Sequence, residues 1–207
     1  MPSSAHQPFP TAVQWSHLLL QPRLQPGMNA VDATAGNGHD ALFLAQHVLP
    51  NGKLFIFDIQ EPAITSTRQR LLDHAIPLDS VEFFQTGHQT LIQSLPPTLH
   101  GQINAIMFNL GYLPGGDKSR ITLTESTLSA IRQALDMLAP DGLLTTVVYP
   151  GHDGGREEAA LVETLFSQLP SDIFEVQKHA FLNYRPTTPY LMAVRRKKAE
   201  AGTPTTP

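Results

Sequence analysis

The sequence predicts an α/β fold in which a doubly wound, mostly parallel sheet of seven strands has helices on both faces and ends in an antiparallel C-terminal hairpin. One reason is that short apolar runs rich in β-branched and aromatic residues alternate with stretches of helical periodicity. A second is a glycine-rich loop between the first strand and the helix after it. A third is that only residues 182–189 join the last two strands, which is too short for a parallel crossover.

In the first half of the chain, turn-forming residues separate the expected elements. Pro26-Gly27 interrupts the chain before the first strand, and Asn51-Gly52 forms a turn before the second. The expected elements are, in order, a helix at 15–20, a strand at 29–32, a helix at 39–48, a strand at 53–59, a helix at 61–74 and a strand at 81–85.

The second half of the chain continues the alternation. One long helix has Leu128, Ile131, Leu135 and Leu138 on a single face, and the turn Pro140-Asp-Gly142 separates it from the next strand. The expected elements are a strand at 103–109, a helix at 122–138, a strand at 143–149, a helix at 155–169 and strands at 174–181 and 190–196.

Length and composition favour a single globular domain. The chain has 207 residues, of which 41% are hydrophobic and 15% charged. We expect the domain to span residues 1–198, with a flexible segment at 1–10 and a disordered tail at 199–207, because both ends are rich in Pro, Ser and Thr. No apolar run reaches the roughly 18 residues of a membrane span, and residues 1–10 lack the pattern of a secretory signal, so a cytoplasmic protein is expected.

Two features of the composition narrow the chemistry. The chain has no cysteine, which excludes disulfide scaffolds, thiolate zinc sites, cysteine-ligated iron–sulfur clusters and attack on a pyrimidine ring by a cysteine nucleophile. The net charge of −4 argues against a general nucleic-acid binder, and the basic run Arg195–Lys198 is typical of a solvated tail.

The glycine loop is the first candidate site. Gly36, Asn37 and Gly38 open a G-x-G-x-x-A pattern between a strand and a helix, where backbone N–H groups and missing side chains let a ligand approach closely. Thr34 and Asp40 flank the pattern and join the expected cofactor site. The pattern alone is weak evidence, because dinucleotide-dependent dehydrogenases share it.

Two acids distinguish between the possible cofactors. Asp32 ends the first strand, where a carboxylate would repel a pyrophosphate but suits the cationic amino-acid end of S-adenosylmethionine (SAM). Asp58 ends the second strand, with Gln60 close behind, and can accept hydrogen bonds from two ribose hydroxyls. The pattern therefore favours SAM, while an NAD site and purely structural capping acids stay open.

Three histidines follow glycines at the expected strand ends. His88 is placed to lie beside the adenine of the cofactor, and His152 is a candidate substrate contact. A metal site formed by His39, His88 and His152 is an alternative, although no short-range ligand spacing supports it.

The segment after the fourth strand is the expected acceptor site. The side-chain oxygen of Asn109 can accept a hydrogen bond from an amine, and the ring of Tyr112 can stack on a planar substrate, so these two are the expected catalytic residues. Asn109 also borders the cofactor. The expected substrate contacts on the same edge of the sheet are Leu110, Gly111, Lys118, Tyr149 and His152.

With these segments in view, the chain resembles a bacterial family labelled rRNA methylases, which are Rossmann-like class I SAM-dependent methyltransferases. The resemblance rests on five segments spread over most of the chain, namely residues 32–40, 57–60, 87–88, 108–118 and 149–155. One branch of the family methylates the 5-aminomethyl group of the wobble uridine or 2-thiouridine in tRNA. The resemblance implies SAM as cofactor and the anticodon loop of tRNA as partner. The lack of a long apolar run predicts no membrane partner, and the residues leave open whether the chain is a monomer or a homodimer.

Other functions remain open at this point. The chain could methylate another RNA or a small amine, because the residues identify an amine acceptor and not the molecule that carries it. A non-catalytic nucleotide-binding protein is the alternative from a different class.

Overall fold

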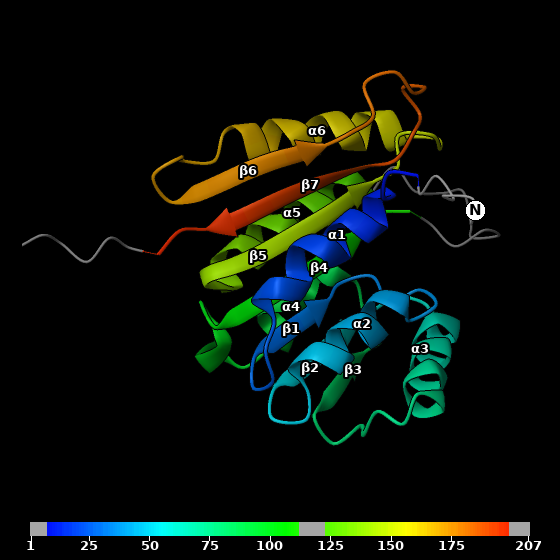
Figure 1. The fold of residues 1–207 in the computed structure, drawn as a ribbon, viewed down its shortest axis with the longest axis vertical. Coiled ribbons are helices and arrows are strands. Elements are labelled where there is room, and N and C mark those ends of the chain that lie inside the picture. Colours follow the sequence, from blue (N-terminus) through cyan, green and yellow to red (C-terminus); the bar gives the residue numbers. More distant parts are fainter. Residues whose placement is uncertain (1–7, 112–122, 199–207) are drawn as a thin grey trace, which may run out of the picture.

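The computed structural model describes residues 8–111 and 123–198. It contains a seven-stranded sheet with the strand order β3-β2-β1-β4-β5-β7-β6 and helices on both faces (Figure 1). The α/β fold expected from the sequence is therefore confirmed. Most of the expected flexible N-terminal segment and the expected C-terminal tail lie outside the described residues.

The strand directions follow from the connections. Parallel pairs join β2 to β3, β1 to β2, β1 to β4 and β4 to β5, whereas β7 is antiparallel to both β5 and β6. The short connection between the last two strands thus forms the expected hairpin. The strands are β1 Asn29–Asp32, β2 Lys53–Phe57, β3 Val81–Phe84, β4 Ile103–Asn109, β5 Leu138–Val148, β6 Phe174–His179 and β7 Tyr190–Arg196.

The helices begin at residues that suit helix starts. Thr11 and Gln14 form a capping box at the first helix, and Gly38 and Gly154, both with positive φ, precede the second and sixth. The helices are α1 Ala12–Leu20, α2 His39–Val48, α3 Glu61–Asp73, α4 Leu91–Ser94, α5 Leu123–Met137 and α6 Gly155–Ser167, with short 3₁₀ turns η1 Gln21–Arg23, η2 His88–Thr90 and η3 Pro97–Leu99.

Some element boundaries differ from the expected ones. The capping box starts α1 at Ala12 instead of Trp15, and the short helix α4 was not expected at all. The expected turn at residues 140–142 falls inside β5, where the pairing jumps from Ile103–Leu138 to Ala105–Leu143. A local bulge therefore replaces a clean turn between helix and strand.

Two apolar cores cover the two faces of the sheet. Alternate residues of β2 point to opposite sides, so Leu54 and Ile56 pack with the helices α1 to α3, while Phe55 and Phe57 pack with α4 to α6. Figure 1 shows α1 and α2 in front of the sheet and α5 behind it. Strands buried on both faces read as continuous apolar runs, which is why the sequence shows them so clearly.

The strand order reverses between β1 and β4, and the carboxyl ends of these strands lie side by side. Ligands of open α/β sheets bind at such a switch point. Among the described residues, no helix is long and apolar enough to cross a membrane.

Candidate active site

The glycine loop is held across the carboxyl ends of three strands. The N–H of Ala33 donates to the carbonyl of Met107 at 2.9 Å, and that of Ala35 donates to the carbonyl of Phe57 at 2.9 Å. Gly38 has a φ of +76° and lies so close to α3 that a Cβ atom would come within 2.8 Å of the Thr67 Cα. Only glycine fits there without strain.

Gly36 differs from Gly38 in what surrounds it. Its φ is +52°, but an added Cβ atom would meet nothing nearer than the carbonyl oxygen of Thr34 at 3.8 Å. The space next to Gly36 is therefore left open by the protein, as a close approach of ligand to backbone requires.

Asp58 connects the end of β2 to this loop. Its Oδ2 atom accepts a hydrogen bond from the N–H of Gly36 at 3.0 Å, and its Oδ1 atom accepts one from the N–H of Gln60 at 2.9 Å. Each carboxylate oxygen has a further lone pair, so Asp58 can still accept the two hydroxyls of a ribose.

Asp32 is fully buried at the end of β1. Its Oδ1 atom accepts the N–H of Thr34 at 3.1 Å, and the backbone of Ala41 also stabilises the carboxylate. Its Oδ2 atom has no partner at hydrogen-bond distance among the described residues. Burial, followed by the nearby charge of Asp40, raises the pKa of Asp32 well above its usual range, and the charge of Asp58 adds to the effect.

The carboxylates of Asp32, Asp40 and Asp58 lie close enough to interact, and this determines which ligand the loop suits. A pyrophosphate would add negative charge to a negative site, whereas an ammonium or sulfonium group would relieve the repulsion and satisfy the orphaned oxygen of Asp32. The residues present therefore fit SAM and disfavour the NAD alternative.

The remaining expected cofactor residues border the same loop. Asn37 is exposed, and its carbonyl accepts a hydrogen bond from Nε of Arg70 at 2.6 Å. His88 follows β3 and its Nδ1 atom lies 3.3 Å from the carbonyl oxygen of Ala33. Burial lowers the pKa of His88, so a neutral imidazole flanks the site.

Asn109 lies at the centre of the acceptor side. Its backbone N–H donates to Oγ1 of Thr34 at 2.8 Å, which ties the end of β4 to the glycine loop. Its side-chain NH₂ group donates to Oδ2 of Asp40 at 3.4 Å, and a further side-chain hydrogen bond joins it to Tyr149. Because a carboxylate only accepts, Asp40 fixes the amide orientation and turns the amide oxygen of Asn109 the other way.

Tyr149 closes this side of the site. Burial, followed by the charge of Asp40, raises the pKa of its phenol, so the hydroxyl stays protonated. An added Cβ atom on Gly111 would lie 3.4 Å from the Tyr149 ring, so the segment after β4 packs against this residue. Leu110 is buried, and its N–H donates to the carbonyl of Val147 at 3.0 Å. Its side chain therefore stabilises the segment after β4 and offers little surface to a substrate.

His17 is a site residue that the sequence did not reveal. Its Nε2 atom lies 2.7 Å from Oδ1 of Asp40, and its ring stacks on Phe43 with 4.0 Å between centroids. The pair joins α1 to α2 across 23 positions of sequence, for which no motif exists. The sequence shows only a histidine in a largely apolar helix.

Glu158 is a second residue whose environment was not expected. Glu157 and Glu158 are both in the first turn of α6, where acids favour the helix dipole. Glu158, however, is buried, accepts a hydrogen bond from Oγ1 of Thr127 at 2.8 Å and interacts electrostatically with His152. Burial raises the pKa of this carboxyl group.

The other expected site residues divide into two groups. His39 is exposed, and the described residues contain no group of three or more His, Asp or Glu side chains that could hold a metal ion, so His39, His88 and His152 do not form such a site. Tyr112 and Lys118 lie outside the described residues.

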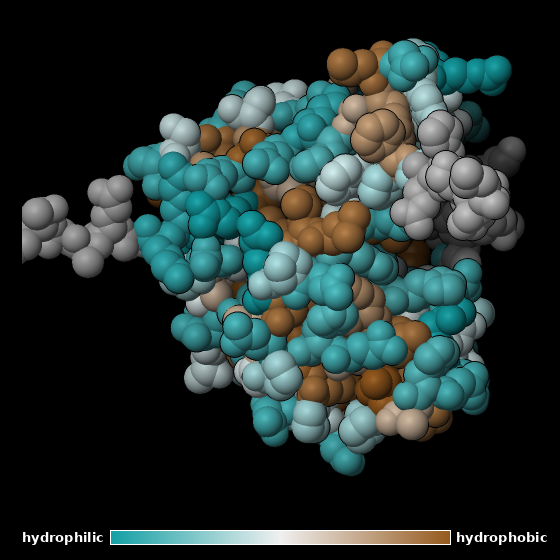
Figure 2. Space-filling view, in the orientation of Figure 1, coloured by the Kyte–Doolittle hydropathy of each residue, from teal (hydrophilic) through white to brown (hydrophobic). Residues whose placement is uncertain are grey.

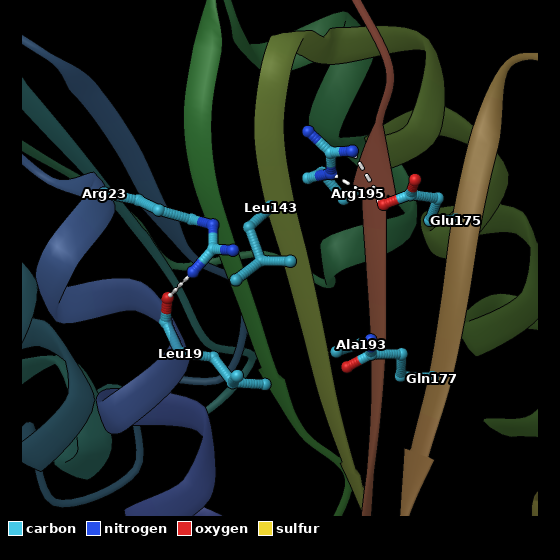
Figure 3. A pocket seen from close by; sticks show the side chains of 7 residues that line it. All are labelled: Leu19, Arg23, Leu143, Glu175, Gln177, Ala193 and Arg195. Carbon is cyan, nitrogen blue, oxygen red and sulfur yellow. Dashed lines mark hydrogen bonds and ion pairs between the residues drawn. The ribbon is translucent and has the colours of Figure 1, made fainter.

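A small hollow on the sheet does not belong to this site (Figure 3). It measures about 50 Å³ and lies near the start of β5 and the end of β7, away from the carboxyl ends of the parallel strands. Arg23 and Arg195 on its rim are engaged with Leu19 and Glu175. Its volume is far below roughly 300 Å³, the lower end of the range for small-molecule sites.

Comparison with known proteins supports the same cofactor. The family model described as "Putative rRNA methylase" matches residues 54–195. The chain is 38% identical over 195 residues to the chloroplastic tRNA (mnm(5)s(2)U34)-methyltransferase of Arabidopsis thaliana, a match that covers 90% of this chain and 70% of the relative.

Two solved structures share both fold and sequence with this chain. A "putative rRNA-methylase" from Clostridium thermocellum has a TM-score of 0.84 and 35% identity, with 92% of this chain and 100% of that one covered. A "putative methyltransferase" from Streptococcus mutans, solved with S-adenosylhomocysteine (SAH), has a TM-score of 0.79 and 33% identity, with 91% and 99% covered. With its fold, its acidic glycine loop and these relatives, the chain belongs to the rRNA-methylase family of SAM-dependent methyltransferases.

Proposed function

We propose that this enzyme methylates the 5-aminomethyl nitrogen of the wobble uridine or 2-thiouridine in tRNA, giving 5-methylaminomethyl-uridine. The observation that carries the proposal is the fixed amide of Asn109, held by Asp40 and Tyr149 beside the glycine loop. Such an amide can align an amine with a methyl donor bound on that loop.

On the donor side, three carboxylates have separate roles in the proposal. Asp32 offers its unpartnered Oδ2 atom to the ammonium group of the methionine part of SAM. Asp58, held by the backbone of Gly36 and Gln60, accepts the ribose hydroxyls, and His88 lies beside the adenine. When bound, SAM supplies a methyl group already activated on a sulfonium.

On the acceptor side, the protein orients more than it activates. The amide oxygen of Asn109 accepts an N–H of the neutral amine, so that the nitrogen lone pair points toward the methyl group. Tyr149 holds the amide in place, and Tyr112 stacks on the pyrimidine ring in the proposed complex. Attack requires the neutral amine, and methyl transfer then gives a secondary ammonium ion and SAH. Asn109 has no charge and cannot be the general base that deprotonates the substrate amine before the attack.

The identity of the acceptor is supported by similarity. The name of the Arabidopsis relative specifies the U34 nucleoside of tRNA, and 90% of this chain aligns with it. The absence of cysteine agrees, because methylation of an amine needs no covalent attack on the pyrimidine ring. A net charge of −4 is compatible with recognition of one unpaired loop instead of a long duplex.

Complementation tests this proposal. The chain is expressed in bacteria that lack their own wobble aminomethyl methyltransferase, and tRNA nucleosides are analysed by mass spectrometry. We expect the 5-methylaminomethyl nucleoside to reappear with the wild-type chain and not with Asn109→Ala. Persistence of the unmethylated nucleoside with the well-expressed wild-type chain contradicts the wobble assignment and favours another RNA or a small amine.

A further inference from the structure

Three exposed residues, one aliphatic and two aromatic, gather around the half-buried Phe181 where β6 turns toward β7. Leu182, Phe9 and Tyr184 are 100%, 77% and 58% exposed, and Phe181 lies between the two aromatic residues. Phe9, Phe181, Leu182 and Tyr184 are called the aromatic patch below. Figure 2 shows hydrophobic surface over this loop at the upper edge of the molecule. Such a cluster on an exposed loop indicates a binding surface.

The rings of the aromatic patch are already arranged for stacking. Phe181 and Tyr184 are stacked, with 4.4 Å between ring centroids and 16° between planes. Phe9 meets Phe181 edge-on, with 6.5 Å between centroids. The stack holds both rings in place while most of Tyr184 stays exposed to a further planar group.

The aromatic patch lies on the same sheet edge as the acceptor side of the site. Since β6 runs parallel to β5, the loop after His179 lies at the same sheet edge as Tyr149 and Asn109 (Figure 1). An added Cβ atom on Gly151 would come within 3.2 Å of the Thr187 carbonyl oxygen, so this loop packs on the segment that follows Tyr149. Trp15 connects the two regions, because it packs with Tyr149 in one apolar cluster and its ring lies 5.2 Å from that of His179.

We propose that the aromatic patch binds unpaired bases of the RNA substrate by stacking, next to the nucleotide that is methylated. The proposal rests on the proposed function in taking RNA as the substrate. Every base offers a flat face to an aromatic ring, and single-stranded RNA is commonly recognised in this way.

The surroundings of the aromatic patch favour RNA over a second copy of this chain. Arg185 follows Tyr184 directly, is exposed and makes no side-chain ion pair within the described parts of the chain, so its guanidinium can meet a phosphate. Polar Asn183 stands between Leu182 and Tyr184, and charged Arg185 follows Tyr184, whereas the core of a stable dimer interface is depleted of charge.

Direct binding tests this inference with the full-length protein. The probes are a fluorescein-labelled, unmodified RNA hairpin with the sequence of a tRNA anticodon arm and a fully paired RNA duplex of the same length. We expect Tyr184→Ala and Phe181→Ala each to weaken hairpin binding about tenfold, the loss expected for one stacked base, and to leave duplex binding unchanged. Tyr184→Phe keeps the ring and should keep wild-type affinity.

Controls separate a local effect from a folding defect. Leu72→Ala removes a side chain that is 50% exposed on α3, remote from the loop, and should not change hairpin binding. Calorimetry should give the wild-type affinity for SAH in every variant. Trp15 is the single tryptophan of the chain, and we expect its fluorescence to change when the hairpin binds and not when the duplex binds.

The outcomes distinguish this inference from the proposed function. If methylation of tRNA proceeds with an unchanged KM in Tyr184→Ala and Phe181→Ala, the aromatic patch is not an RNA-binding surface, while the proposed function stands. If hairpin binding depends on Tyr184 but no methyl group reaches the wobble nucleoside, the proposed function fails alone. If Tyr184→Ala changes only the oligomeric state in sedimentation, the patch is a contact between copies and the inference is overturned.

Discussion

Asp32 is a residue whose environment is unfavourable for the ligand-free fold. The carboxyl group is fully buried, keeps one oxygen without a hydrogen-bond partner and faces the charges of Asp40 and Asp58. A cationic ligand turns this cost into binding free energy, because it supplies the missing partner and the opposite charge. Stability and function are therefore expected to oppose each other at this position.

Asp32→Asn tests that opposition through pH. The pKa of Asp32 is raised above its ordinary 3.8 in the folded chain, so the folded state binds the proton more tightly than the unfolded state. Asp32 therefore contributes a loss of stability as the pH rises from about 3.8 through its folded value, and the variant lacks this contribution. We expect the Tm of ligand-free Asp32→Asn to rise relative to that of the wild type as the pH increases above about 4.

The same variant should bind SAH more weakly. Loss of a charge-assisted hydrogen bond predicts at least about a tenfold decrease in affinity by calorimetry. A Tm difference independent of pH, or an unchanged affinity, would contradict the assigned role of Asp32.

Asn109→Ala separates the acceptor side from the donor side. The side chain contacts Asp40 and Tyr149, whereas the backbone N–H that binds Thr34 is kept in the variant. We expect SAH affinity within about tenfold of the wild type and loss of most of kcat, which is typical of an interaction that matters in the transition state. Asn51→Ala, in the turn before β2, is a matched control and should retain activity.

Among the structural elements, the glycine loop contains two glycines, Gly36 and Gly38, with different roles. Gly38→Ala places a Cβ atom 2.8 Å from Thr67 at a φ of +76°, while Gly36→Ala places one in open space at +52°. We expect Gly36→Ala to lower the free energy of unfolding by about 1 kcal/mol and Gly38→Ala by about 2 kcal/mol or more, measured by denaturant titration.

For SAH binding, we expect the opposite ranking of the two variants, with the larger loss in Gly36→Ala. In the proposed complex the ligand occupies the space beside Gly36. The methyl group added by Gly36→Ala should therefore reduce SAH affinity by more than its small effect on stability explains. Equal losses of affinity in the two variants would indicate that the whole loop is disturbed instead.

Helix α1 is a second element with a role in the site, because His17 binds the carboxylate that orients Asn109. Loss of one hydrogen bond to a charged group predicts that His17→Ala lowers the free energy of unfolding by about 2 kcal/mol. We also expect kcat to fall with little change in SAH affinity. His47→Ala is the matched control, since His47 packs on the same Phe43 ring but its Nδ1 atom is bonded to the Phe43 carbonyl instead of to Asp40. A similar fall in kcat for both variants would assign His17 a purely structural role.

At the scale of the whole molecule, the sequence predicted the sheet but not every contact within it. Strand positions and directions were predictable because doubly buried strands form apolar runs and because residues 182–189 are too few for a crossover. Asp32, Asp58 and Asn109 were found because the end of a parallel strand is a defined place in sequence.

Other features depend on packing between distant elements. The His17–Asp40 contact and the burial of Glu158 have no local pattern, since each depends on which helix folds over the sheet edge. The bulge at residues 140–142 was likewise missed, because the same Pro-Asp-Gly sequence fits a free turn as well as an interrupted ladder.

The most direct test of the proposed reaction is methyl transfer in a purified system. The enzyme is incubated with SAM that carries a deuterated methyl group and with an anticodon hairpin that has 5-aminomethyl-2-thiouridine at the wobble position. The RNA is then digested, and its nucleosides are analysed by mass spectrometry. We predict one labelled methyl group on the wobble nucleoside, and none in a hairpin with unmodified uridine there. Label on any other nucleoside, or none on the wobble nucleoside while SAH binds normally, would contradict the account.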